Sequence, residues 1–172
     1  MAEDILVSVL LSAVATTALF AVYEHIRDWW REREERKRVF RVLLAELHNV
    51  LERCDVNFAT VGEEESSLHP TAPLIPSTLI PLGTLGWDLL RSTGVAATLD
   101  AGTLTHLYAL YNQVDTHNKF MTLRERFIAS DIPTSIQPTY IKDYDEKLLK
   151  TLEIIKTEIV VVEPEIKRRV YC

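Results

Sequence analysis

The stretch that decides the fold is ILVSVLLSAVATTALFAVY, residues 5–23, together with the charged run HIRDWWREREERKR that follows it at residues 25–38. The first stretch has no charged residue over 19 positions. At the helical rise of about 1.5 Å per residue, it would cover about 28 Å, close to the thickness of a bilayer's hydrocarbon core. We therefore expect residues 1–23 to form a transmembrane anchor and residues 24–39 to continue it as a charged helical stalk.

Two other interpretations of the apolar stretch carry less weight. A cleaved signal peptide has a basic start and a shorter apolar core, whereas this chain begins Met-Ala-Glu-Asp and its apolar run ends in a basic block. A buried core helix is seldom this long. The aromatic and arginine side chains that follow suit the headgroup region of a membrane, and we predict that this interface is made by Tyr23, Trp29, Trp30, Arg27 and Arg31.

Charge on the two sides of the anchor predicts its direction. Glu3 and Asp4 precede the apolar stretch, and seven basic residues follow it before position 42. The positive-inside bias then predicts a single-pass protein of the cell (inner, cytoplasmic) membrane, with its N-terminus outside and its C-terminal domain in the cytoplasm. In that reducing compartment we expect Cys54 and Cys172 to be free thiols, with Cys54 packed on an apolar helix face.

Small side chains recur every four residues in the anchor. Ser8, Ser12 and Thr16 form one such row, and a second row lies beside it. Because this spacing lets membrane helices approach closely, it predicts self-association of the anchor. The competing interpretation is that serine and alanine are simply common in membrane spans, and the row contains no glycine.

The charge balance argues against nucleic acid as a partner. Residues 24–41 contain seven basic and five acidic side chains, a net charge of +2, so the rest of a chain of net charge −6 carries −8. Nucleic-acid binding depends on clustered Lys and Arg, which an acidic domain lacks. The basic cluster of the stalk is better explained by the headgroups of the lipid bilayer.

Apolar spacing predicts a helical domain over residues 40–172. We expect a helix from Glu24 to about Phe58, a proline-rich loop at residues 59–81, a short helix from Leu85 to about Ser92 with Thr84 as its N-cap, and a third helix at about 101–129 capped by Asp100. A last helix should begin near Thr139, and its β-branched run before Pro164 should fray or become extended. The fold class is all-α, a small antiparallel helical bundle. Its predicted core includes Leu43, Leu47, Val50, Trp87, Leu107, Tyr111, Leu148, Leu152 and Ile155.

One segment resembles a pattern met in small uncharacterised prokaryotic proteins that have one N-terminal membrane helix. The residues that carry the resemblance are Thr84, Trp87, Gly94, Tyr111 and Asn118. It covers about a fifth of the chain. It implies the same architecture, an anchor with a cytoplasmic helical domain, and implies no reaction.

The sequence predicts neither a cofactor nor a metal site. The five histidines have no pair at the three- or four-residue spacing of a helical metal site, there is no Cys-x-x-Cys, and no glycine-rich phosphate loop is present. The one catalytic candidate is Arg41 with His48, seven residues apart, which resembles the Arg-x6-His motif of the all-helical HEPN ribonucleases. Against it, Val42 stands where that motif has a polar residue, and Arg41 and His48 are also explained as surface charges on a helix.

These observations favour a non-enzymatic function. We expect an interaction or scaffold protein that acts by self-association, as a homo-oligomer, or by docking an unidentified membrane or cytoplasmic protein at the cytoplasmic face of the membrane. The alternative is a membrane-linked sensor or effector whose bundle binds a small anionic or nucleotide ligand. A HEPN-like ribonuclease is the third hypothesis.

Overall fold

The computed structural model describes residues 2–67, 79–129 and 137–171, except for the helical side chains at 2–12, 63–67 and 137–139. All the regular secondary structure of these residues is helical, with no strand, so the prediction of an all-α fold is confirmed for them. The helices are α1 (Ala2–Ser67), α2 (Leu85–Ser92), the short 3₁₀ helix η1 (Val95–Thr98), α3 (Ala101–Ile128) and α4 (Gln137–Tyr171).

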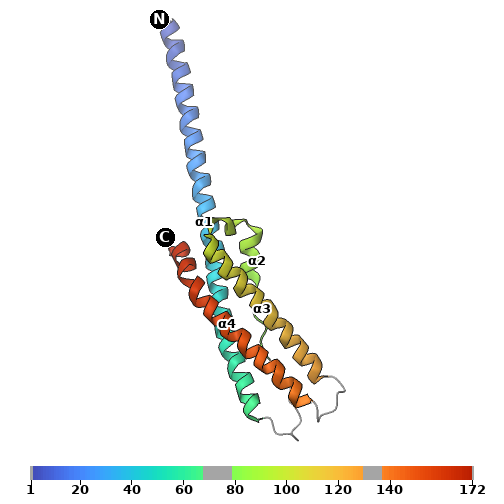
Figure 1. Ribbon diagram of the computed structural model, residues 1–172. Coiled ribbons are helices and arrows are strands. Elements are labelled where there is room, and N and C mark those ends of the chain that lie inside the picture. Colours follow the sequence, from blue (N-terminus) through green and yellow to red (C-terminus); the bar gives the residue numbers. More distant parts are fainter. Residues whose placement is uncertain (1, 68–78, 130–136, 172) are drawn as a thin grey trace. The chain divides into compact units, whose positions relative to one another are not determined.

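The chain divides into two units, Met1–Arg38 and Val39–Cys172. In the second unit α3 and α4 lie side by side and run in opposite directions, with the second half of α1 and the short α2 packed against them (Figure 1). All four α-helices contribute to one apolar core. Its fully buried members include Leu43, Leu47, Val50, Leu90, Leu107, Leu110, Val114, Leu152, Ile155 and Ile166.

A smaller apolar cluster lies away from this core. It joins Val61 of α1, Leu79, Met121 of α3 and Leu148 of α4. Val61 continues the three- and four-residue spacing of the buried residues of α1, which explains why α1 extends to Ser67 and does not end near Phe58 as the sequence predicts. The proline-rich loop is correspondingly shorter, and residues 68–78 of it lie outside the described residues.

The last helix also differs from the sequence expectation. α4 continues through Pro164 to Tyr171, although proline removes one backbone hydrogen bond from a helix. Ile166 and Val170 are both buried in the core beyond the proline. Burial of these two side chains offsets the missing hydrogen bond, which the local sequence preference of the β-branched run did not reveal.

The shorter elements follow local chemistry. Asp100 accepts a hydrogen bond from the backbone N–H of Thr103 at 2.9 Å, which confirms its predicted role as the N-cap of α3. The helix α2 also ends near Ser92 as expected, because Gly94 has φ 70°, a left-handed conformation that ends α2 and starts η1. Thr84 stands before α2 but makes no capping hydrogen bond.

No helix is long and apolar enough to cross a membrane within the part of the chain whose residues the structure describes. The predicted span at 5–23 begins in residues 5–12, whose side chains, including those of Ser8 and Ser12, lie outside that description.

Candidate functional site

Glu46, on α1, makes hydrogen bonds to both α2 and α3. Its Oε2 accepts from the backbone N–H of Gly86 at 2.7 Å, and its Oε1 accepts from the N–H of Trp87 at 3.4 Å and from the hydroxyl of Tyr111 at 2.5 Å. The two backbone donors are in the first turn of α2, where a carboxylate interacts favourably with the helix dipole. Glu46 thus caps α2 from another helix, in the role that the sequence assigned to Thr84.

The aromatic residues beside Glu46 form one stack. The ring of Trp87 lies parallel to that of Tyr111, with centroids 5.1 Å apart, and meets Tyr108 edge-on at 4.9 Å. Arg91 places its guanidinium 5.8 Å from the Trp87 ring. Burial, reinforced by the Glu46 carboxylate, raises the pKa of Tyr111 far above its ordinary value. The phenol therefore stays protonated and continues to donate to Glu46.

This arrangement depends on a glycine. A Cβ on Gly86 would lie 2.9 Å from the Cα of Leu43, closer than side chains approach a backbone. The absence of a side chain at position 86 lets α2 approach α1 until the backbone N–H reaches Glu46.

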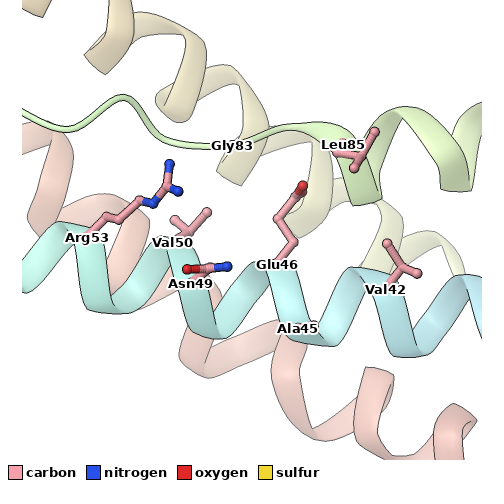
Figure 2. A pocket seen from close by; sticks show the side chains of 8 residues that line it. All are labelled: Val42, Ala45, Glu46, Asn49, Val50, Arg53, Gly83 and Leu85. Carbon is pink, nitrogen blue, oxygen red and sulfur yellow. The ribbon is translucent and has the colours of Figure 1, made fainter.

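Beside Glu46 the surface is hollowed into a pocket of about 330 Å³. Figure 2 shows the residues that line it: Val42, Ala45, Glu46, Asn49, Val50 and Arg53 of α1, with Gly83 and Leu85 opposite. The two charged groups are already used, because Glu46 caps α2 and Arg53 donates to the carbonyl of Pro81 at 2.6 Å. The rest of the lining is largely apolar, so the pocket suits an apolar or neutral group better than an anion.

Two asparagines hold the segment of residues 79–84 that leads into α2. Asn57 of α1 accepts from the N–H of Ile80 at 2.8 Å and donates to its carbonyl at 2.9 Å. Asn118 of α3 makes the same pair of bonds with Leu82, both at 3.0 Å. The two side-chain amides thus supply hydrogen-bond partners for the backbone N–H and C=O groups of Ile80 and Leu82, which lie outside any helix.

A buried polar chain extends from Asn57 into the bundle. The Nε2 of His117 lies 3.4 Å from the Nδ2 of Asn57, and its Nδ1 lies 3.0 Å from the hydroxyl of Thr151, which donates to the Leu148 carbonyl at 2.8 Å. Since the hydroxyl proton is used, Nδ1 must donate and Nε2 must accept, which fits the neutral ring. Burial lowers the pKa of His117 to about 4, with a hydrogen bond to Leu148 acting in the opposite direction.

A second buried polar contact joins α3 to α4. The Nε of Arg124 donates to Oδ1 of Asp145 at 2.6 Å, and both side chains are almost fully buried. An ion pair at this depth adds little net free energy to the fold, because both charges have lost their hydration. Removing one partner alone is nevertheless strongly destabilising, because it leaves the other charge buried.

The catalytic candidates that the sequence predicts, Arg41 and His48, lie at the surface of α1. The Nε2 of His48 lies 2.7 Å from Oε1 of Glu163 on α4, and Arg41 is exposed. His106 makes a similar contact with Glu158, at 2.8 Å. The predicted core residues of α1, α2, α3 and α4 are all buried. In the first unit the predicted interface residues Tyr23, Trp29, Trp30, Arg27 and Arg31 are exposed, as is Thr16.

Sequence reasoning overlooked Glu46, Asn57 and His117. Two of these carried a signal, because Asn57 and His117 occupy positions on the apolar stripes of their helices, between Cys54 and Val61 and between Val114 and Met121. A polar residue on such a stripe is expected to be buried and hydrogen-bonded. Glu46 lies beside its stripe, and nothing in the sequence connects it with Gly86.

The described residues contain no group of three or more His, Cys, Asp or Glu side chains placed to hold a metal ion. Cys54 is buried, and burial raises the pKa of its thiol to about 12, so it is chemically inert. No protein-family model, no curated protein and no solved structure matches this chain.

Proposed function

We propose that the protein is a membrane-anchored interaction module, held at the cytoplasmic face of the cell membrane by its N-terminal helix. The observation that carries the proposal is the exposure of apolar side chains on every side of α1 from residue 13 to residue 23. Leu19, Phe20 and Val22 are all more than half exposed. A helix that is apolar all round needs an apolar surrounding, and lipid supplies one on every face at once.

The residues that follow support the same placement. Tyr23, Trp29 and Trp30 are exposed, and the guanidinium of Arg33 lies 5.6 Å from the Trp29 ring. Amphipathic aromatic rings beside arginines are typical of the headgroup region. The acidic residues before the apolar stretch and the basic ones after it favour a cytoplasmic second unit.

The contacts of the second unit support binding over catalysis. Glu46, Asn57, His117 and Asn118 each hold one element against another through the bonds described above. Groups used in this way stabilise a rigid surface. A rigid helical surface attached to a membrane suits self-association or the docking of a partner protein.

Membrane fractionation with a pair of matched variants tests the anchor. Val14 and Val160 are 66% and 68% exposed, one in each unit. Val14→Arg should shift the protein from the alkali-resistant membrane fraction toward the soluble fraction, because an arginine near the middle of a span costs about 2.5–3.5 kcal/mol. Val160→Arg should leave the distribution unchanged. Release of the wild-type chain by alkaline carbonate would refute the anchor.

A second candidate function is ligand sensing through the pocket beside Glu46. The observation that favours it is the cavity of about 330 Å³, large enough for a small molecule. A thermal-shift screen of the full chain in detergent, with nucleotides and with neutral apolar compounds, tests it. Ligand binding should raise the unfolding temperature of the wild-type protein but not of an Ala45→Trp variant, whose side chain would fill the pocket.

A further inference from the structure

The stalk carries one stripe of positions with the spacing of a coiled coil. In the second unit the buried residues of α1 recur at alternating steps of three and four, through Phe40, Leu43, Leu47, Val50 and Cys54. Counting back from Phe40 by the same steps reaches four residues of the first unit, Arg36, Arg33, Trp29 and Ile26. We call these four the stalk seam. They occupy the a and d positions of a heptad repeat.

The two sides of the stalk differ in chemistry. The positions farthest from the seam between residues 24 and 38 are charged without exception, with both signs present: Glu24, Arg27, Asp28, Arg31, Glu34, Glu35 and Arg38. The apolar side chains of the same stretch lie on the seam or directly beside it, and Ile26 and Trp29 are 49% and 47% exposed. A helix with one charged side and one partly apolar side is suited to a partner along the apolar side.

The charges that flank the seam fit a second copy of the same helix. In a parallel pair, each g position faces the e position five residues later in the other helix. Here these positions are Glu32 and Lys37, which have opposite charges. The same carboxylate of the second copy would also lie beside Arg33, at an a position.

The two arginines on the seam already have contacts within their own helix. Arg36 already contacts Glu32 of its own helix at 3.5 Å, and Arg33 lies over the Trp29 ring. Both charges are therefore partly compensated within one helix before any pairing. A polar residue at a single a position lowers the stability of a coiled coil but fixes its register.

We infer that the protein self-associates as a parallel dimer through the stalk seam, with a second copy of the chain as the partner. The inference rests on the proposed function, because two helices anchored in the same bilayer start out parallel and at a high local concentration. It names the surface of self-association as Ile26, Trp29, Arg33 and Arg36, flanked by Glu32 and Lys37.

Disulfide trapping of the full chain in native membranes tests the inference. Single cysteines are placed on the seam, as Ile26→Cys and Trp29→Cys, and on the charged side, as Arg27→Cys and Asp28→Cys, each with Cys172→Ser. The buried Cys54 stays in place because its thiol is inert. A disulfide requires Cα atoms within about 4.4–6.8 Å of each other, so oxidation with copper phenanthroline should link the seam variants several-fold more than the controls. Equal linkage at all four positions, or none at positions 26 and 29, would overturn the inference.

A charge exchange supplies an independent measurement. Lys37→Glu in the Ile26→Cys chain should lower the linked fraction, because Glu32 would then face a glutamate. Adding Glu32→Lys should restore it. If the seam instead lies on a membrane surface, adding Glu32→Lys should not restore the linked fraction. Fractionation of the same samples separates the two proposals: a membrane-bound chain without seam linkage contradicts the dimer alone, whereas a chain found in the soluble fraction contradicts the anchor.

Discussion

Residues 13–38 and residues 39–61 belong to the same helix but differ in the exposure of their apolar side chains. In the first stretch every large apolar side chain is exposed, with Leu19 at 71%. In the second, the apolar residues at three- and four-residue spacing are buried, with Leu43 at 0%. The local backbone is the same in both, an α-helix.

The difference shows that helix formation and burial are separate events in this chain. The apolar stripe of residues 39–61 is buried because α2, α3 and α4 supply matching apolar faces within the same unit. Residues 13–38 find no such faces among the described residues of their own unit and, under our proposals, take a partner from outside, either lipid or a second copy. Paired substitutions, one in each stretch or one buried and one exposed, measure how much more the buried residues contribute to stability than the exposed ones.

The largest contrast is expected between a buried and an exposed ion pair. Asp145→Asn should lower the free energy of unfolding by about 3–5 kcal/mol, because it leaves the Arg124 charge buried without its carboxylate. Glu32→Gln removes the exposed stalk contact with Arg36 and should cost about 0–1 kcal/mol. Urea denaturation followed by circular dichroism in detergent measures both. Similar losses of stability for the two variants would mean that burial does not control how much these ion pairs contribute to the free energy of unfolding.

Two leucine truncations compare the stretches directly. Leu43→Ala should destabilise the second unit by about 2–5 kcal/mol, since it removes a fully buried side chain and leaves a cavity. The same change at Leu19, an exposed position, should leave this unfolding transition unchanged within about 0.5 kcal/mol. Unfolding midpoints of the two variants, measured under the same conditions, supply the test. A large effect of Leu19→Ala would show that the first unit contributes to the stability of the second.

A pH titration compares a buried histidine with an exposed one. The pKa of His117 is lowered from 6.5 to about 4, so the unfolded chain binds this proton more readily than the folded chain. The contribution of the neutral His117 ring to the free energy of unfolding is then fully present above pH 6.5. It is lost as the pH falls toward about 4, by about 3 kcal/mol in total. His117→Gln should flatten the dependence, and His25→Gln in the stalk should not. An unchanged slope in His117→Gln would assign the acid sensitivity to other groups.

Two glycine substitutions should have effects of opposite sign. Gly86→Ala places a Cβ 2.9 Å from the Cα of Leu43 and should destabilise the second unit by about 1–3 kcal/mol, because α2 must move away from Glu46. Gly62→Ala meets nothing within 4 Å and lies inside α1, where alanine is favoured over glycine by about 0.5–1 kcal/mol. Thermal unfolding of both variants tests the signs. If Gly86→Ala were neutral, the close approach would not control the position of α2.

Much of the fold could be predicted because its signals are local. The limits of α2, the start of α3 and its Asp100 cap follow from apolar spacing, from Gly94 and from a capping side chain. The errors lie where distant residues outweigh local preference. Val61 extends α1, and Ile166 and Val170 carry α4 past Pro164, because each of these side chains is buried against another element.

The candidate site was less predictable than the fold. Glu46 reaches Gly86 across 40 residues, and Asn118 reaches Leu82 across 36, so neither contact has a local signature. His117 and Arg124 interrupt the stripe of α3, which marks them as buried polar residues without naming Thr151 or Asp145 as their partners.

By itself, the sequence determined the all-α class, the helix periodicity, the caps at Asp100 and Gly94, and the contrast between an apolar start and a charged stalk. These depend on side chains within a few residues of each other, where chain connectivity fixes the geometry. Only the tertiary structure decided which apolar stripe is covered, which carboxylate caps α2, and which asparagines hold the segment before it. Those contacts join residues that are distant in the chain, and the packing of whole helices brings them within hydrogen-bonding distance.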